Sequence, residues 1–186
     1  MRCPRCLAAL LLAALSMLLL LSGCNTDTTA SESVAEPVSP MELTYATQFS
    51  VDKYANGCRL VTIANDRYLV VPEGITPPGD LDENIVLLQQ PLDNIYLVAT
   101  SAMDLFRALD SLDCVRLSGT DADGWYIPEA KQAIENGKML YAGKYNAPDY
   151  ERILSEGCNL AVESTMIYHT PEIKEQLERL GIPVLV

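Results

Sequence analysis

The sequence predicts a three-layer α/β domain, a parallel sheet flanked by helices, preceded by a small antiparallel β meander. Two observations predict this fold class. After residue 94, short apolar runs recur about every 20 to 25 residues with amphipathic helical segments between them, which is typical of a parallel sheet with helical crossovers. Before residue 75, apolar and polar side chains alternate as in half-buried strands.

The first element is a targeting segment. Two arginines precede a hydrophobic run at residues 7–21, and residues 21–24, LSGC, match a lipobox, the motif at which bacteria attach diacylglycerol to a cysteine. We predict a lipoprotein signal peptide over residues 1–23 and lipidation of Cys24, on the extracytoplasmic face of the cell membrane. An ordinary signal peptide or transmembrane anchor is the alternative, but the run is short for a spanning helix.

A disordered tether is predicted over residues 24–40, because Thr, Ser, Glu and Pro dominate and large apolar side chains are almost missing. Residues 41–186 then form one domain. Loss of the two signal-peptide arginines reduces the 13 basic side chains to 11, which against 25 acidic ones gives a net charge of −14. Such a chain is not expected to bind nucleic acid, and its scattered charges are typical of solvated surfaces.

Three cysteines remain in the predicted domain, Cys58, Cys114 and Cys158. An odd number does not build a disulfide framework, and their spacing does not resemble a zinc site. We interpret them as small, mostly buried side chains in or at the edges of strands.

The meander comprises alternating residues 45–51, followed by strands at residues 60–63 and 68–71, with turns at 56–57 and 65–66. A passage rich in Pro and Gly, residues 72–80, separates it from the parallel sheet. The five strands of that sheet are expected at residues 95–99, 114–117, 139–141, 160–162 and 183–186.

Helices are expected between these strands. In the first, Ser101 and Asp104 form a capping pair, and one apolar face is expected from Ala102, Leu105, Phe106, Leu109 and Leu112. In the last, Thr170 caps the helix, Gly181 ends it, and the buried face comprises Ile173, Leu177 and Leu180. Two shorter helices are predicted at residues 128–136 and 149–156.

Ligands of parallel sheets bind at the carboxyl ends of the strands. Five segments reach that edge here: residues 100–101, 118–125, 142–146, 163–169, and whatever follows residue 186. Cys114 and Cys158 begin their strands and therefore belong to the opposite edge.

Several short motifs occur in a characteristic order: Thr100-Ser101, IENGK at 134–138, Gly143, PDYERIL at 148–154, and LERLGIPV at 177–184. With the lipobox, this order resembles the substrate-binding lipoproteins of iron-siderophore, haem and cobalamin ABC importers, the class III periplasmic binding proteins, over residues 42–186. The resemblance implies two α/β lobes joined by a long helix, with ligand in the cleft between them.

The chain ends where the N-terminal lobe of that family passes into the linking helix, so we expect an N-terminal lobe without the second lobe. Cys158 and Asn159 depart from the proline and aspartate common in the family, a change expected to be structural. Glu151 matches the glutamate that, in relatives, docks against arginines of the membrane permease. A carboxylate in the first turn of a helix is also stabilised by the helix dipole, which is the alternative role of Glu151.

Aromatic side chains on the crevice loops are the candidate ligand contacts, because large planar ligands bind by apolar and stacking contacts. They are Trp125, Tyr126, Tyr145 and Tyr168. For each of them, packing between the loop and the core explains the aromatic side chain at least as well. Ser101 is a candidate for an anionic edge of the ligand, or a simple helix cap. His169, beside Tyr168 and near Met166, is a candidate iron contact or a structural residue.

The sequence therefore predicts a solute-binding protein for an iron-siderophore complex that is handed to an ABC permease. Haem or a corrinoid is the alternative cargo, and a single-lobe envelope interaction module without cargo is the alternative function. An enzyme is not expected, because no Gly-x-Ser-x-Gly or His-Glu-x-x-His motif is found and the chain has one histidine. No cofactor is expected.

Overall fold

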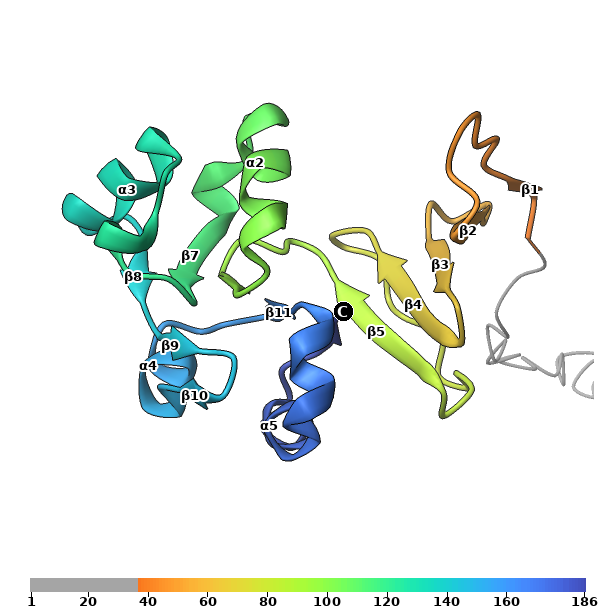
Figure 1. Ribbon diagram of the computed structural model, residues 1–186. Coiled ribbons are helices and arrows are strands. Elements are labelled where there is room, and N and C mark those ends of the chain that lie inside the picture. The colour runs from red at the N-terminus through yellow and green to blue at the C-terminus, as the bar shows by residue number, and fades with distance from the viewer. Residues whose placement is uncertain (1–36) are drawn as a thin grey trace, which may run out of the picture. The chain divides into compact units, whose positions relative to one another are not determined.

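Two sheets organise the part of the protein that the computed structural model describes, residues 37–186 (Figure 1). The predicted signal peptide and Cys24 lie outside the described residues, as does most of the predicted tether. The tether was predicted to extend to Pro40, but Ser39–Pro40 form strand β1, which pairs with β2. Backbone hydrogen bonding therefore already holds the last two residues assigned to the tether.

The first sheet has five strands in the order β1-β2-β3-β4-β5. After β1 they are β2 (Phe49–Lys53), β3 (Arg59–Ile63), β4 (Asp66–Val71) and β5 (Ile85–Gln89). The pairings from β1 to β4 are antiparallel, which confirms the meander, whereas β5 pairs parallel with β4. Strand β5 was not predicted from the sequence, and the first strand begins at Phe49 rather than at the predicted Tyr45, which is exposed outside β2.

The second sheet is entirely parallel, in the order β12-β11-β6-β7-β8. Its strands are β6 (Ile95–Leu97), β7 (Val115–Ser118), β8 (Leu140–Tyr141), β11 (Leu160–Val162) and β12 (Val184–Leu185). All five lie where apolar runs predicted them, so the parallel sheet is confirmed. A separate hairpin, β9 (Gly143–Lys144) with β10 (Ala147–Pro148), was not predicted.

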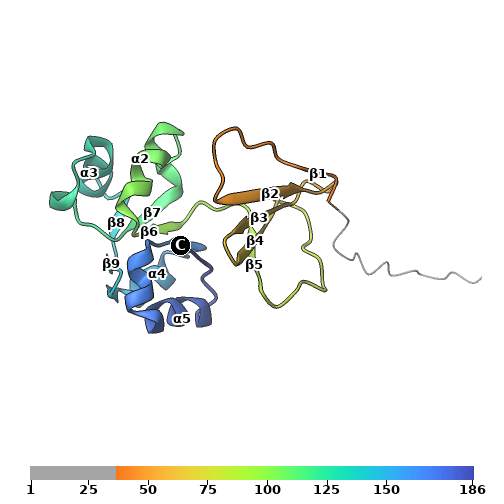
Figure 2. The ribbon, with the colours of Figure 1, turned by 45° about the vertical axis from the view of Figure 1, so that its right-hand side comes forward.

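Residues 37–186 contain four α-helices, α2 (Thr100–Ala108), α3 (Pro128–Glu135), α4 (Tyr150–Ser155) and α5 (Pro171–Arg179). Figures 1 and 2 show α2 and α3 on one side of the parallel sheet, with α4 and α5 on the other. One buried cluster joins Leu97 and Val162 to the α2 and α3 side. A second cluster joins Tyr96 and Ala161 to the α4 and α5 side, so helices cover both faces.

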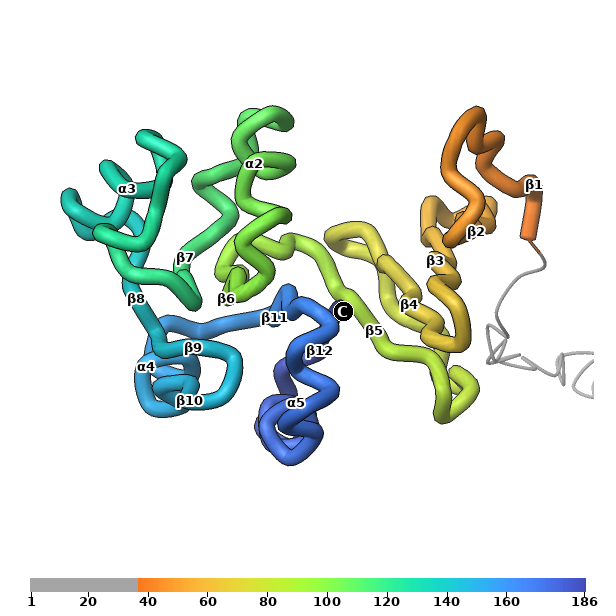
Figure 3. The backbone as a smooth tube through the Cα atoms, viewed as in Figure 1, coloured from red at the N-terminus to blue at the C-terminus, as the bar shows by residue number. Residues whose placement is uncertain are grey.

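The core of the parallel sheet continues into the first sheet. Tyr68 of β4 and Leu88 of β5 belong to the same buried cluster as Leu97 and Val162. The Tyr68 hydroxyl donates a hydrogen bond to the Val184 carbonyl oxygen at 3.4 Å, and the chain passes from β5 into β6 within a few residues (Figure 3). One buried cluster therefore spans both sheets.

Two helix starts differ from their prediction. Ala99 is the N-cap of α2, so Ser101 lies inside the first turn and makes no capping bond, while Asp104 pairs with Arg107 at 2.7 Å. Thr170 is the N-cap of α5, as predicted, but its side chain does not cap, and its buried Oγ1 lacks a hydrogen-bond partner among the described residues.

The predicted inner face of α2 is also wrong in part. Leu105 and Leu109 are 64% and 75% exposed, whereas Met103 is fully buried. Ala102 and Phe106 do pack against the core beside Met103, as expected of that face. The predicted inner face of α5 is confirmed, because Leu177 is buried and Ile173 packs on the same cluster.

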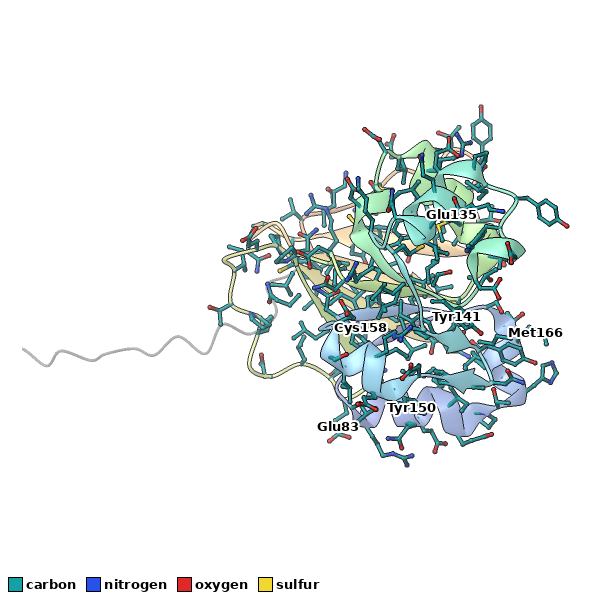
Figure 4. The ribbon with its side chains drawn as sticks, turned by 90° about the vertical axis from the view of Figure 1, so that its left-hand side faces the viewer. Glu83, Glu135, Tyr141, Tyr150, Cys158 and Met166 are labelled. Carbon is teal, nitrogen blue, oxygen red and sulfur yellow. The ribbon has the colours of Figure 1, made fainter. Side chains whose placement is uncertain are left out.

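The three cysteines within the described part of the chain are free thiols. Cys58 is buried, and Cys114 and Cys158 are half-buried. Cys58 and Cys114 directly precede β3 and β7, and Cys158 lies two residues before β11. Figure 4 shows Cys158 and Met166 toward opposite ends of the parallel sheet, which agrees with the prediction that Cys158 lies away from the carboxyl edge. Burial raises the pKa of the Cys58 and Cys158 thiols.

Candidate functional site

A depression with a volume of about 290 Å³ lies at the carboxyl edge of the parallel sheet. Three of the predicted edge loops contribute to it, those after β6, β7 and β8. The lining residues are Val98, Thr100, Gly119, Thr120, Asp121, Gly124, Lys144 and Tyr145. The topological rule thus identifies the edge at which the depression is found.

The β6 and β7 sides of the depression are held close together. The Gly119 amide donates a hydrogen bond to the Leu97 carbonyl oxygen at 2.8 Å. A Cβ atom at Gly119 would lie 2.9 Å from Val98 Cα, so only glycine permits this approach. Asp121 then caps the short 3-10 helix η2 (Ala122–Gly124), because its Oδ1 accepts from the Gly124 amide at 3.0 Å.

The lining has a mixed chemistry. Lys144 and Asp121 supply opposite charges, Thr100 and Thr120 supply hydroxyl groups, and half-buried Tyr145 supplies an aromatic ring. Such a surface binds through hydrogen bonds, charge and ring contact. Within residues 37–186, no group of three or more His, Cys, Asp or Glu side chains is placed to hold a metal ion.

Of the predicted ligand contacts, Tyr145 lines the depression, and Ser101 is exposed directly after Thr100, which also lines it. Trp125 is different, because it is buried in the core. Its indole N–H donates to Ser118 Oγ and to the Thr120 carbonyl oxygen, both at 3.1 Å. These contacts agree with the alternative role of Trp125, packing between loop and core, rather than with ligand contact.

Three other candidates do not line the depression. Tyr126 is 99% exposed, two residues before α3, and Tyr168 is 56% exposed on the 3-10 helix η3 (Thr165–His169). His169 is exposed at the end of the same helix. The structure therefore brings Tyr145 and Thr100 together at the depression, whereas Ser101 adjoins it only in sequence and these three side chains do not line it.

Glu163, which the sequence analysis did not single out, directly follows β11 at the carboxyl edge. It is 3% exposed, and neither carboxyl oxygen has a hydrogen-bond partner in the described chain. Burial raises the pKa of this carboxyl to about 8, so it is mainly protonated at neutral pH. The sequence signal that could have identified Glu163 is an acidic residue immediately after an entirely apolar strand.

Tyr96 is hydrogen-bonded to the backbone beside the rim of the depression and interacts electrostatically with Glu163. Its hydroxyl donates a hydrogen bond to the Gly143 carbonyl oxygen at 2.8 Å, and Gly143 directly precedes Lys144 and Tyr145. Burial, and secondly the nearby Glu163, raises the pKa of the Tyr96 hydroxyl well above its ordinary value. Gly143 has φ +86°, and a Cβ there would overlap the Ala147 carbonyl oxygen.

Glu151 is exposed in the first turn of α4. The turn is fixed by its neighbours, since Asp149 Oδ1 accepts from the Arg152 amide at 3.0 Å. The Arg152 guanidinium in turn donates to the Tyr141 carbonyl oxygen at 2.8 Å. This position satisfies a docking role and a helix-dipole role equally.

No helix within residues 37–186 is both long enough and apolar enough to span a membrane. No protein-family model and no curated protein sequence matches the chain.

Proposed function

We propose that the protein is a lipid-anchored, extracytoplasmic solute-binding protein that delivers an iron-siderophore complex to an ABC importer. The observation that carries the proposal is the depression at the carboxyl edge of the parallel sheet, with its cation, hydroxyl groups and tyrosine ring. A ferric siderophore presents oxygen-rich, often anionic edges and extended apolar or aromatic parts. Lys144 and the two threonines suit the former, and Tyr145 suits the latter.

The depression is open and small for a complete site, because pockets that enclose a drug-sized ligand measure about 300 to 1,000 Å³. This agrees with one half of a cleft, as in the N-terminal lobe of the class III binding proteins that the sequence resembles. Haem or a corrinoid is the alternative cargo within the same proposal.

Direct titration tests the binding function. Ferric hydroxamate and ferric catecholate siderophores, haemin and cyanocobalamin are each titrated into the full chain, and heat or absorbance is recorded. We expect Tyr145→Ala and Lys144→Ala to weaken binding of the siderophore about tenfold or more. Tyr45→Ala is the matched control, because Tyr45 is exposed and does not line the depression. If Tyr45→Ala weakened siderophore binding equally, the depression would not be the binding site.

One observation favours a second candidate, an envelope interaction module without cargo. Tyr126, Met166 and Tyr168 are large side chains left exposed on segments near the carboxyl edge. If none of the four probes binds at any concentration tested, while a pull-down with the permease succeeds and is lost in Tyr126→Ser, this second function replaces the first.

Lipid anchoring is tested separately, since Cys24 lies outside the described residues. Globomycin treatment should cause the unprocessed precursor to accumulate, and mass analysis should find diacylglycerol on Cys24. A mature N-terminus at another residue, without lipid, would contradict the anchor.

A further inference from the structure

Glu163 stands in an unusual position for an acid. The strand alternates, so Ala161 and Glu163 lie on the same face of the sheet, the one covered by α4 and α5. Its backbone amide still belongs to the sheet and donates to the Leu185 carbonyl oxygen at 2.8 Å. The side chain is 3% exposed with both oxygens unpartnered, which is costly for a carboxylate and tolerable only for a neutral acid.

The titratable groups around Glu163 come from several elements. Tyr96 of β6 and Tyr150 of α4 both interact with it electrostatically. Tyr141 and Cys158 adjoin Tyr96, and Glu172 and Arg179 of α5 adjoin Tyr150; Figure 4 labels Tyr141, Tyr150 and Cys158. Burial is the only cause of the raised Glu163 pKa, so none of these groups offsets its charge.

Tyr96 is the group that can respond to ionisation of Glu163. Its hydroxyl now donates to a backbone carbonyl, the Gly143 oxygen. A carboxylate is a stronger acceptor than a carbonyl, by roughly a factor of two in hydrogen-bond energy. A buried carboxylate without a donor would therefore compete for this hydroxyl.

We propose that Glu163 is a proton-controlled switch for residues 143–148: neutral Glu163 leaves Tyr96 bonded to Gly143, and ionised Glu163 takes that hydroxyl and frees the hairpin. The Glu163 proton leaves to solvent, whereas Tyr96 keeps its own proton and changes acceptor. Gly143 is crowded against Ala147, and Lys144 and Tyr145 line the depression, so loss of this bond alters its rim. The effect on cargo rests on the proposed function, but the hairpin response does not.

Nuclear magnetic resonance of the isotope-labelled full chain in detergent tests the switch between about pH 6 and 9. The Glu163 carboxyl carbon and the amides of residues 143–145 should titrate with one common midpoint. Glu163→Gln, which stays neutral, should abolish the amide titration. Tyr96→Phe should abolish the amide titration as well, and its hairpin amides should show, at every pH, the chemical shifts that the parent chain shows at alkaline pH. His169→Gln, which replaces the only histidine, is the control and should titrate like the parent chain.

Persistence of the amide titration in Glu163→Gln would overturn the switch. So would titration of the carboxyl carbon without movement of the hairpin, as expected if trapped water alone satisfies Glu163. Should Glu163→Gln fail to fold, the two midpoints in the parent chain still decide, because unequal midpoints exclude coupling. Ferric hydroxamate affinity should fall with ionisation; absence of binding at every pH refutes the cargo function and leaves the hairpin result valid.

Discussion

Ser118 fixes the loop after β7 through its hydroxyl. Its fully buried Oγ accepts from the Trp125 indole N–H and from the Thr120 amide, each at 3.1 Å, and donates to the Thr120 carbonyl oxygen at 2.6 Å. Asp121 and Gly124 of the depression lie on the loop between these contacts. A small polar residue at the end of an apolar strand thus positions the loop that lines the depression.

Ser118→Ala should lower the free energy of unfolding by about 1 to 2 kcal/mol, because the Thr120 amide loses its partner while the Trp125 N–H retains one. Chemical denaturation followed by circular dichroism measures the change. Ser101→Ala is the control, and as an exposed residue without a capping bond it should cost less than about 0.5 kcal/mol. A similar loss in both variants would contradict this role of Ser118.

Glu163 makes stability depend on pH. Its folded-state pKa of about 8 lies above the ordinary value of 4.5, so the native state holds the proton more tightly than the unfolded chain. Its favourable contribution is complete below pH 4.5 and is lost progressively as pH rises to about 8. The total loss is on the order of 5 kcal/mol.

Glu163→Gln should therefore flatten the decline of the melting temperature over this range, as measured by calorimetry at several pH values. Glu151→Gln, which changes an exposed carboxylate, should keep the decline of the parent chain. An unchanged decline in Glu163→Gln would show that Glu163 is already ionised in the native state.

At the scale of the element, α2 shows what a helical pattern leaves undetermined. Apolar residues on nearly every side allow two inner faces, and periodicity favoured the one that includes Leu105 and Leu109. The helix instead buries Met103 and leaves both leucines exposed. The preceding strand β6 ends at Leu97, so the connection of two residues, not the pattern, sets the rotation of the helix.

The two faces of α2 make opposite predictions. Met103→Ala should cost about 2 to 5 kcal/mol, since it opens a cavity in the fully buried core. Leu109→Ala, in contrast, should change the free energy of unfolding by less than about 0.5 kcal/mol. Urea denaturation of both variants compares them, and a larger loss for Leu109→Ala would restore the face expected from periodicity.

Strand β5 was not predicted because of the segment that connects it to β4. Its apolar residues 85–88 are visible in the sequence, but parallel pairing with β4 requires a crossover, and residues 72–84 contain no helix to signal one. The parallel strands, by contrast, alternate with helices, and each lay where its apolar run predicted it. Local pattern predicts elements well when the connection between them is itself regular.

For the whole molecule, the sequence predicted the edge of the sheet that carries the depression but not most of its lining. Topology follows from the alternation of strand and helix, so the edge could be deduced. Which side chains meet there depends on loop conformation, and only Tyr145 of the aromatic candidates lines the depression. Glu163 escaped notice because its importance lies in burial without a partner, which no sequence pattern displays.

Docking to a permease is a proposed property of the whole molecule, and substitutions of Glu151 test it. If Glu151 only favours the helix dipole, Glu151→Gln should cost about 0.3 to 1 kcal/mol and leave uptake unchanged. If it docks, Glu151→Lys should place like charge against the permease arginines and weaken docking by on the order of several kcal/mol, an effect that should decrease as salt is added.

We expect Glu151→Lys to reduce uptake of the iron complex in cells severely while its affinity in solution stays within about twofold, because Glu151 does not line the depression. Glu129→Lys is the matched control, an exposed acidic residue in the first turn of α3. It applies the same charge reversal at a different helix start and should leave uptake near normal. Equal uptake in the two variants would reject docking, and loss of both affinity and uptake in Glu151→Lys would indicate misfolding of α4 instead.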